Sequence, residues 1–222
     1  MQLDARLRLF MYLIGVFLTC LLIGNLIGGK LTSVTILGDE RLISAGQLSF
    51  PLTFVLTDIV NEFYGRRTAR ALTMLGFFMT ALAFGLLHLA GAVPFAAQTA
   101  ITPAAFENVF TSATRIQIAS MIAYLVAQFL DIGVFFLIKK ATGDRFLWLR
   151  ATGSTAVSQL VDTILVTCIA FTFLPASALV NIILTSYAVK LVAAVGMTPV
   201  IYALHELLER RFGLRPVPAE PR

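Results

Sequence analysis

The sequence predicts an all-α fold, a polytopic membrane bundle of six transmembrane helices. Its composition is 58% hydrophobic and only 13% charged, whereas soluble chains are about half apolar and about a quarter charged. The apolar residues come in blocks of about twenty, the length needed to cross about 30 Å of hydrocarbon at about 1.5 Å per residue. The basic residues are distributed unevenly between alternate connecting segments, which is typical of membrane proteins. We therefore expect a single transmembrane domain over residues 1–211 and a short disordered cytoplasmic tail over 212–222.

The six predicted spans occupy most of the chain. The first follows Arg6 and Arg8 and shows no small-residue cleavage site, so we expect an uncleaved helix rather than a signal peptide. The spans cover approximately residues 9–29, 48–65, 69–89, 116–138, 149–173 and 186–209.

Three segments between or beside the spans have other predicted roles. Residues 30–47 alternate apolar and polar side chains around a Gly38-Asp39 turn signal, which predicts a short extracytoplasmic hairpin. Residues 90–115 predict a loop with one interfacial helix. Residues 176–185 are apolar but too few to span, so we expect them to lie against the bundle.

The distribution of Lys and Arg predicts the orientation. With the N-terminus inside, thirteen of the 17 basic residues fall on the cytoplasmic side as anchors at helix ends, and three fall outside. This asymmetry favours cytoplasmic N- and C-termini and an even number of spans. It also accounts for the net charge of +5 without nucleic-acid binding. We therefore expect the protein to lie in the lipid bilayer and to bind no nucleic acid.

Charged and amide side chains occur inside the predicted spans, where burial is costly unless they face a cavity or a partner. In the second span Asp58 and Glu62 are spaced i, i+4 on one face, with Asn61 beside them. Polar stripes continue in the fourth, fifth and sixth spans, comprising Gln117, Ser120, Tyr124, Gln128 and Asp131, then Thr155, Ser158, Gln159 and Asp162, then Tyr187 and Lys190. Such stripes predict a polar pocket for a small-molecule substrate near mid-membrane.

The predicted substrate-binding residues are the carboxylates, amides and aromatic hydroxyls of these stripes. They are Asp58, Glu62, Asn61, Tyr124, Gln128, Gln159, Asp162, Tyr187 and Lys190. Candidates for proton coupling are Asp58, Glu62 and Asp131, because two close carboxylates rarely both stay ionised. The alternative is that these groups tie helices together, with Lys190 pairing with one carboxylate and Asp131 in a structural role.

Other features concern packing. Pro199 is expected to kink the sixth span because it lacks a backbone N–H. Small residues recur at Ala119, Ala123 and Ala127 and at Gly24 and Gly28. We expect these faces to form internal helix contacts, with a homodimer interface as the alternative.

The sequence lacks recognisable enzyme and cofactor-binding motifs. His205-Glu206 lacks a second histidine one turn on, and the sequence has neither a nucleophile elbow nor a Gly-rich phosphate loop. Cys20 and Cys168 both fall within apolar spans and are expected to pack as small hydrophobic residues. We therefore predict a protein that is not an enzyme and has no cofactor or metal.

One run of the second span is distinctive. The sequence PLTFVLTDIVNEFYG, Pro51 to Gly65, followed by a basic cluster, resembles the signature of the queuosine precursor transporter family, also described as vitamin uptake transporter-like. The stretches AQFLDIGVF, SQLVDTILV and SYAVK, in this order, are similar to other marks of the family.

The resemblance implies a six-helix inner-membrane protein that imports 7-cyano-7-deazaguanine and its aminomethyl relative. The positions that match the family's marks are Thr57, Asp58, Glu62, Tyr64, Gln128, Asp131, Gln159, Asp162 and Lys190. A guanine-type edge would suit a carboxylate, Asp58 or Asp162, which accepts from its two N–H groups. Its carbonyl and ring would suit an amide, Gln128 or Gln159, and an aromatic side chain, Tyr124 or Tyr187.

Two transport hypotheses remain. The leading one is a stand-alone transporter working by alternating access, without ATPase partners. The alternative is the substrate-binding subunit of an energy-coupling vitamin transporter, which requires ATPase and scaffold subunits. Proton coupling and facilitated entry followed by metabolic trapping are both compatible with the sequence.

Overall fold

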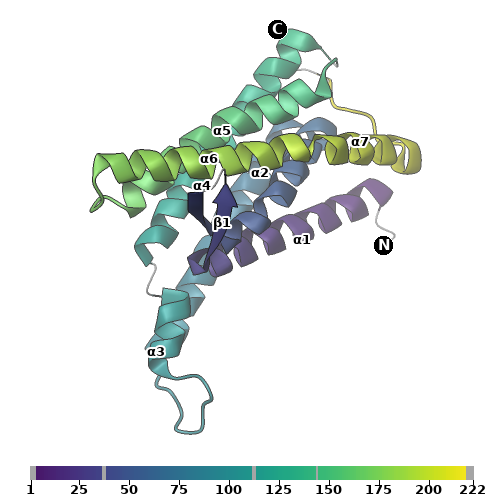
Figure 1. Ribbon diagram of the computed structural model, residues 1–222. Coiled ribbons are helices and arrows are strands. Elements are labelled where there is room, and N and C mark those ends of the chain that lie inside the picture. Colours follow the sequence, from purple (N-terminus) through teal and green to yellow (C-terminus); the bar gives the residue numbers. More distant parts are fainter. Residues whose placement is uncertain (1–3, 37–38, 112–113, 144, 219–222) are drawn as a thin grey trace.

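The fold was analysed in a computed structural model, which describes residues 4–36, 39–111, 114–143 and 145–218. Helices make up most of it (Figure 1). The elements are α1 (Ala5–Leu26), η1 (Ile27–Gly29), β1 (Leu31–Ile36), β2 (Asp39–Ser44), η2 (Ala45–Leu48), α2 (Phe50–Ala92), α3 (Pro103–Phe106), the π-helical η3 (Glu107–Thr111), α4 (Thr114–Thr142), α5 (Leu147–Ala170), α6 (Ala176–Gly196) and α7 (Thr198–Phe212).

Five helical segments in the described part of the chain are long and apolar enough to cross a membrane. They are Arg6–Gly29, Phe50–Ala92, Pro103–Thr142, Leu147–Ala170 and Ala176–Phe212. The class of fold is therefore confirmed as a helical membrane bundle. The predicted spans 48–65 and 69–89 both fall within the single 43-residue helix α2, so the total of six crossings stays a prediction.

Helix α2 doubles back on itself at Gly65. We call residues 50–64 its first arm and residues 66–92 its second arm. Along the first arm, Thr57 and then Glu62 contact Gln128 and then Lys139 of α4, so this arm follows the direction of α4. The second arm runs against α4, because Thr73 contacts Tyr124 and His88 contacts Thr114. The two arms thus run in opposite directions through the bundle.

The reversal depends on the backbone of Gly65, with φ +82° and ψ 172°, a conformation that residues with a Cβ rarely adopt. It interrupts the helical hydrogen bonds and leaves carbonyl groups of the last turn to find other partners. The Glu62 carbonyl accepts from the Val217 N–H at 2.8 Å. The Phe63 carbonyl accepts from Nη2 of Arg6 at 2.8 Å. The bend is therefore held by both terminal segments of the chain.

The predicted hairpin within 30–47 is confirmed. Strands β1 and β2 pair antiparallel, with Leu31 opposite Ser44 and Ile36 opposite Asp39. Ser44 then donates from its hydroxyl to the Gly28 carbonyl at 2.6 Å, which ties the hairpin to η1, directly after α1. The turn residue Gly38 lies outside the described residues, and the side of the membrane stays a prediction.

The prediction for residues 176–185 is wrong. These residues form the first half of α6, which continues without interruption to Gly196, so this span begins about ten residues earlier than expected. Pro175 precedes the helix and sets its start. Near Pro199 the helix is interrupted at Met197, but α6 and α7 follow one another in nearly one line (Figure 1), so the expected kink stays a prediction. The loop 90–115 contains the short helices α3 and η3.

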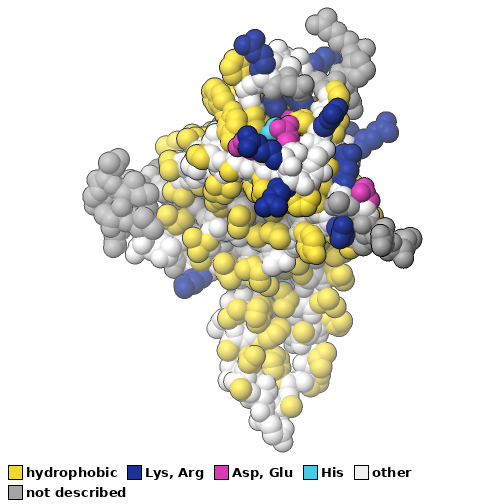
Figure 2. Space-filling model, turned by 90° about the vertical axis from the view of Figure 1, so that its right-hand side faces the viewer, with side chains coloured by type: hydrophobic (Ala, Val, Ile, Leu, Met, Phe, Trp, Pro, Cys, Tyr) yellow, Lys and Arg dark blue, Asp and Glu magenta, His cyan; other side chains and the backbone are white. Residues whose placement is uncertain are grey.

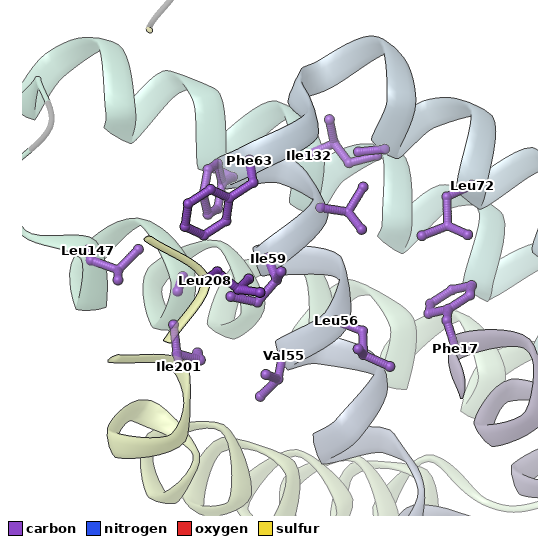
Figure 3. Packing of buried hydrophobic residues seen from close by; sticks show 14 of the residues in the cluster. Phe17, Val55, Leu56, Ile59, Phe63, Leu72, Ile132, Leu147, Ile201 and Leu208 are labelled. Atoms are coloured by element: carbon purple, nitrogen blue, oxygen red, sulfur yellow. The ribbon is translucent and has the colours of Figure 1, made fainter. Parts of the chain in front are cut away.

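The core lies where the first arm of α2 meets its neighbours. Figure 3 shows Val55, Ile59 and Phe63 of this arm facing Leu147 of α5 and Ile201 of α7. Side chains of α1 and α4, among them those of Phe17 and Ile132, complete the cluster. The first arm is thus the central helix of the bundle, and its polar side chains are necessarily internal.

The helix faces with small residues are packed inside the helix bundle. Ala119, Ala123 and Ala127 are buried in α4. A Cβ added at Gly24 would lie only 3.4 Å from the carbonyl oxygen of Gly46, so this glycine permits close approach of α1 to η2. The expectation of internal contacts is confirmed, whereas a homodimer stays a prediction.

Basic side chains gather at one end of the molecule. Figure 2 shows Lys and Arg clustered in the upper part of this face, around acidic side chains and a histidine. The start of α1 and the end of α7 lie at this end (Figure 1). The segment after α7 packs here as well, with Leu214 buried and Val217 bonded to α2. The disordered tail was predicted over residues 212–222, but Leu214 and Val217 within it pack against the bundle. Residues 219–222 lie outside the described part, and the cytoplasmic location stays a prediction.

Candidate functional site

Polar side chains inside the bundle separate into three groups along the first arm of α2. One group surrounds Glu62 near the basic end. A second surrounds Asp58 and Asn61. A third is the pair of Asp162 and Lys190. Most of the predicted pocket residues are therefore buried, with Tyr124, Asp162 and Tyr187 partly buried, and they lie in different chemical surroundings.

Glu62 is the centre of a buried ion cluster. Its carboxylate accepts two hydrogen bonds from Arg150 of α5, at 2.9 and 2.8 Å. It accepts a third from Lys139 of α4 at 3.1 Å. His205 of α7 places Nε2 at 3.8 Å from the same carboxylate. Glu62 thus joins four helical segments and has little capacity left for a ligand.

The basic partners of Glu62 correct part of the sequence interpretation. Lys139 and Arg150 are among the thirteen basic residues predicted as cytoplasmic anchors at helix ends, but they are 0% and 1% exposed and bind Glu62 inside the bundle. A buried charge is tolerated when it is paired and hydrogen-bonded, and Glu62 provides both. The carboxylate of Glu62 within an apolar span is the signal that could have indicated buried basic partners, but the spacing does not say which basic residues they are.

Asp58 differs sharply from Glu62. It is 2% exposed, and neither of its carboxylate oxygens has a hydrogen-bond partner. Asn61, 0% exposed, likewise has no partner for its amide nitrogen or its amide oxygen. Both side chains are one turn apart on the same helix face. They form an unsatisfied polar site in a region closed to solvent.

The side chains around Asp58 come from α4 and α5. Asp131 of α4, also buried, interacts electrostatically with Asp58 and accepts a hydrogen bond from Ser158 of α5 at 3.1 Å. Gln128 donates from Nε2 to the Thr57 hydroxyl at 2.9 Å. Together with Asn61, these residues form the central polar cluster, defined here as Thr57, Asp58, Asn61, Gln128, Asp131 and Ser158.

Asp162 and Lys190 form a separate ion pair between α5 and α6. Lys190 Nζ donates to Asp162 at 2.6 Å and lies 5.5 Å from the ring centroid of Phe50, at the beginning of α2. The Asp162 side chain is 16% exposed, more than that of Asp58. Lys190 therefore pairs with a carboxylate in this structure, as the alternative interpretation of the sequence predicted.

The two candidate tyrosines and Gln159 lie at the edges of these groups. The Tyr124 hydroxyl donates to the Thr73 carbonyl at 3.2 Å, next to Gly76. The Tyr187 hydroxyl donates to the Ala156 carbonyl at 3.1 Å. Gln159 is 7% exposed, one residue from Ser158 on α5. Both tyrosines thus already hold helices together in this conformation.

Tyr64, which the family resemblance singled out, lies at the bend rather than in the central polar cluster. Its hydroxyl donates to the Arg6 carbonyl at 3.0 Å, and its ring packs against Phe10 with centroids 4.8 Å apart. Tyr64 therefore ties α1 to the bend.

A cavity of about 260 Å³ lies elsewhere, at the far end of the second arm of α2. It is lined by His88, Gly91, Phe95, Pro103, Phe106 and Glu107. The predicted site residues do not line it, so it is distinct from the central polar cluster.

Comparison with known proteins identifies relatives along most of the chain. Residues 44–204 match the family described as "Putative vitamin uptake transporter". The chain is 34% identical to the "Probable queuosine precursor transporter" of Bacillus subtilis over 73% of this chain and 72% of that protein. It is 29% identical to the "Queuosine precursor transporter" of Escherichia coli over 80% of this chain and 79% of that protein. No solved structure matches the chain.

Proposed function

The chain belongs to the vitamin uptake transporter family, and from this premise we propose that it imports queuosine precursors, 7-cyano-7-deazaguanine and related 7-deazaguanines. Family membership makes it a multi-pass membrane transporter rather than an enzyme. Relatives named as queuosine precursor transporters in two bacteria support the class of cargo. The observation that carries the proposal is the 34% identity to one of them along most of both chains.

The proposed route passes through the central polar cluster. Carboxylate, amide and hydroxyl groups there match the donors and acceptors of a purine-like base. The central position of the first arm of α2, between α4, α5 and α7, supports a pocket within the membrane. Because Asp58 is 2% exposed, this conformation is closed at the cluster. Entry and release then require alternating access, as in other secondary transporters.

Helices α6 and α7 are proposed to take part in opening. The break before Pro199 removes one helical hydrogen bond and separates α6, which carries Lys190, from α7, which carries His205. Movement of one helix need not be transmitted fully to the other. The ion pair of Lys190 and the contact of His205 with Glu62 are then the interactions that change between states.

The test is uptake of 7-cyano-7-deazaguanine in a host that lacks its own precursor synthesis and transporter, scored as queuosine in tRNA. Wild-type protein is expected to restore queuosine, and the empty vector is not. The chain carrying Glu206→Gln, an exposed position outside the bundle interior, is the matched control and should also restore it. No restoration by well-expressed wild type would contradict the proposed cargo.

The same host separates the second transport hypothesis. A substrate-binding subunit of an energy-coupling transporter requires ATPase partners, so it should fail when expressed alone in a host that has no such partners. Restoration under that condition supports a stand-alone transporter. The family description as a vitamin uptake transporter is the observation that keeps the second hypothesis relevant.

A further inference from the structure

Asp58 and Asn61 are the two buried residues in the described part of the chain in which two polar side-chain atoms each lack a hydrogen-bond partner. In the ranges that the structure describes, eight buried side-chain nitrogen or oxygen atoms lack a hydrogen-bond partner. Four of them belong to these two residues, and the others are spread over Gln47, Arg66, Thr80 and Gln117. Two neighbouring side chains therefore have every polar atom free at the centre of the bundle.

Leaving such groups unpaired is unfavourable, because a buried polar atom has lost its water and gained nothing in exchange. Native proteins rarely retain unpaired buried groups without a functional cause. Two cations that could form an ion pair with Asp58 are buried in the same bundle, namely Lys139 and Arg150. Both cations instead bind Glu62, one turn away. The arrangement keeps the carboxylate of Asp58 free for another partner.

The other interior carboxylates are less available. Glu62 accepts hydrogen bonds from both cations. Asp162 is paired with Lys190 at 2.6 Å. Asp131 accepts the Ser158 hydroxyl. Asp58 is therefore the interior carboxylate with two free acceptor oxygens, and Asn61 adds a free donor and a free acceptor one turn further.

We propose that Asp58 and Asn61 are the specificity-determining pair, and that they bind the edge of a base carrying two adjacent N–H donors beside a carbonyl. Asp58 accepts from the ring N–H and the exocyclic amine, and Asn61 donates from its amide nitrogen to the carbonyl. This is the edge of a 2-amino-4-oxopyrimidine ring. The inference rests on the proposed function, and it selects Asp58 over Asp162 as the carboxylate that contacts the base.

The chemistry predicts discrimination by the exocyclic amine. A carboxylate that receives two N–H groups loses one hydrogen bond when the amine is missing, and a buried acceptor then remains unpaired. Bidentate recognition of a base edge gives discrimination on the order of 10- to 100-fold. 7-Deazaguanine carries the amine, whereas 7-deazahypoxanthine lacks it and keeps the ring N–H and the carbonyl.

The experiment measures how well these two bases compete with labelled 7-cyano-7-deazaguanine for wild-type protein purified in detergent. Wild type is expected to prefer 7-deazaguanine by on the order of 10- to 100-fold. Asp58→Asn should lose this preference, because its carboxamide offers one acceptor and places a donor against the exocyclic amine. Asn61→Ala should weaken both competitors alike and keep their ratio, because both bases carry the carbonyl.

Thr73→Val is the matched control. Thr73 is a buried α2 residue whose hydroxyl bonds to the Ala69 carbonyl, outside the central polar cluster. This variant should leave the preference unchanged. An unchanged preference in folded Asp58→Asn, or equal competition by the two bases for wild type, would overturn the inference. Equal competition by the two bases for wild type overturns the inference even where Asp58→Asn does not fold.

Failure of the proposed function is distinguishable from failure of this inference. If wild type neither takes up nor binds 7-cyano-7-deazaguanine, the proposed cargo is wrong, and so are the proposed contacts to the edge of its base. If wild type takes up 7-cyano-7-deazaguanine but does not distinguish 7-deazaguanine from 7-deazahypoxanthine, the proposed cargo is supported and the proposed role of Asp58 and Asn61 is wrong.

Discussion

Asp58 and Glu62 lie one turn apart on the same arm of α2, yet they have opposite surroundings. Glu62 receives hydrogen bonds from Lys139 and Arg150, whereas both oxygens of Asp58 are free. Glu62 and its two cations form a hydrogen-bonded cluster that joins helices and is costly to break, whereas the carboxylate of Asp58 makes no such contact. We therefore propose that Glu62 maintains the helix bundle and that Asp58 binds the ligand.

This assignment predicts that Glu62→Gln destabilises the protein strongly. Removing the carboxylate leaves two buried cations without a counter-ion, which typically costs about 3–5 kcal/mol. Thermal unfolding of the purified protein in detergent should show a clearly lower midpoint. Glu206→Gln, which breaks an exposed pair with Arg210, should unfold near the wild-type temperature because surface pairs contribute little. Equal midpoints for the two variants would contradict the role of Glu62.

Helix α2 illustrates how one residue decides the course of an element. The apolar stretches of residues 50–92 are interrupted by polar and basic residues at 61–70, where two separate spans were predicted, and the conformation of Gly65 sets the point at which the chain reverses. The carbonyls that the bend releases bond to Arg6 and Val217, from opposite ends of the chain. The bend is thus both a local conformation and a junction of distant segments.

Gly65→Ala is expected to destabilise the bend. A Cβ at φ +82° is strained, and such positions typically cost about 1–3 kcal/mol. Gly133→Ala in α4 is the matched control, because its added Cβ meets no atom within 4 Å and the backbone is helical. Alanine there should be neutral or slightly stabilising. Thermal unfolding of both variants measures the difference, and a Gly65→Ala midpoint at or above that of Gly133→Ala would argue against strain.

At the scale of the molecule, the arms of α2 and the other long helices form a bundle with one basic end. The first and last helices meet this end, where Arg6, Glu62 and Val217 are linked. If each arm of α2 crosses the membrane separately, the count of crossings is six and both termini share a side. The excess of basic residues predicts that this side is the cytoplasm.

Cysteine accessibility tests this arrangement. Single cysteines would replace Thr32 in β1, Arg67 after the bend and Thr102 before α3, all exposed, in a chain with Cys20→Ala and Cys168→Ala. A membrane-impermeant maleimide on intact cells should label positions 32 and 102 and leave position 67 unlabelled until the cells are broken. If α2 crossed only once, position 102 would instead be protected in intact cells.

The sequence alone determined the class of protein, the placement of most helices, the hairpin and the family. These features depend on local properties, namely the length of apolar blocks, alternation, turn residues and a contiguous motif. It also indicated that polar residues of α2, α4, α5 and α6 lie inside the bundle. The start of α6 was misplaced, because an apolar stretch of ten residues does not reveal whether it joins the next span.

Only the tertiary structure decided how the interior charges are distributed. Glu62 pairs with residues 77 and 88 positions away, and spacing along one helix carries no record of such contacts. The same is true of the pairing of Asp162 with Lys190. The sequence predicted two separate spans on either side of residues 66–68, and the structure adds that the chain reverses at Gly65, with φ +82°. Which carboxylate remains free for a ligand therefore follows from how the helices pack, because each cation can neutralise only the acid that the fold brings within reach.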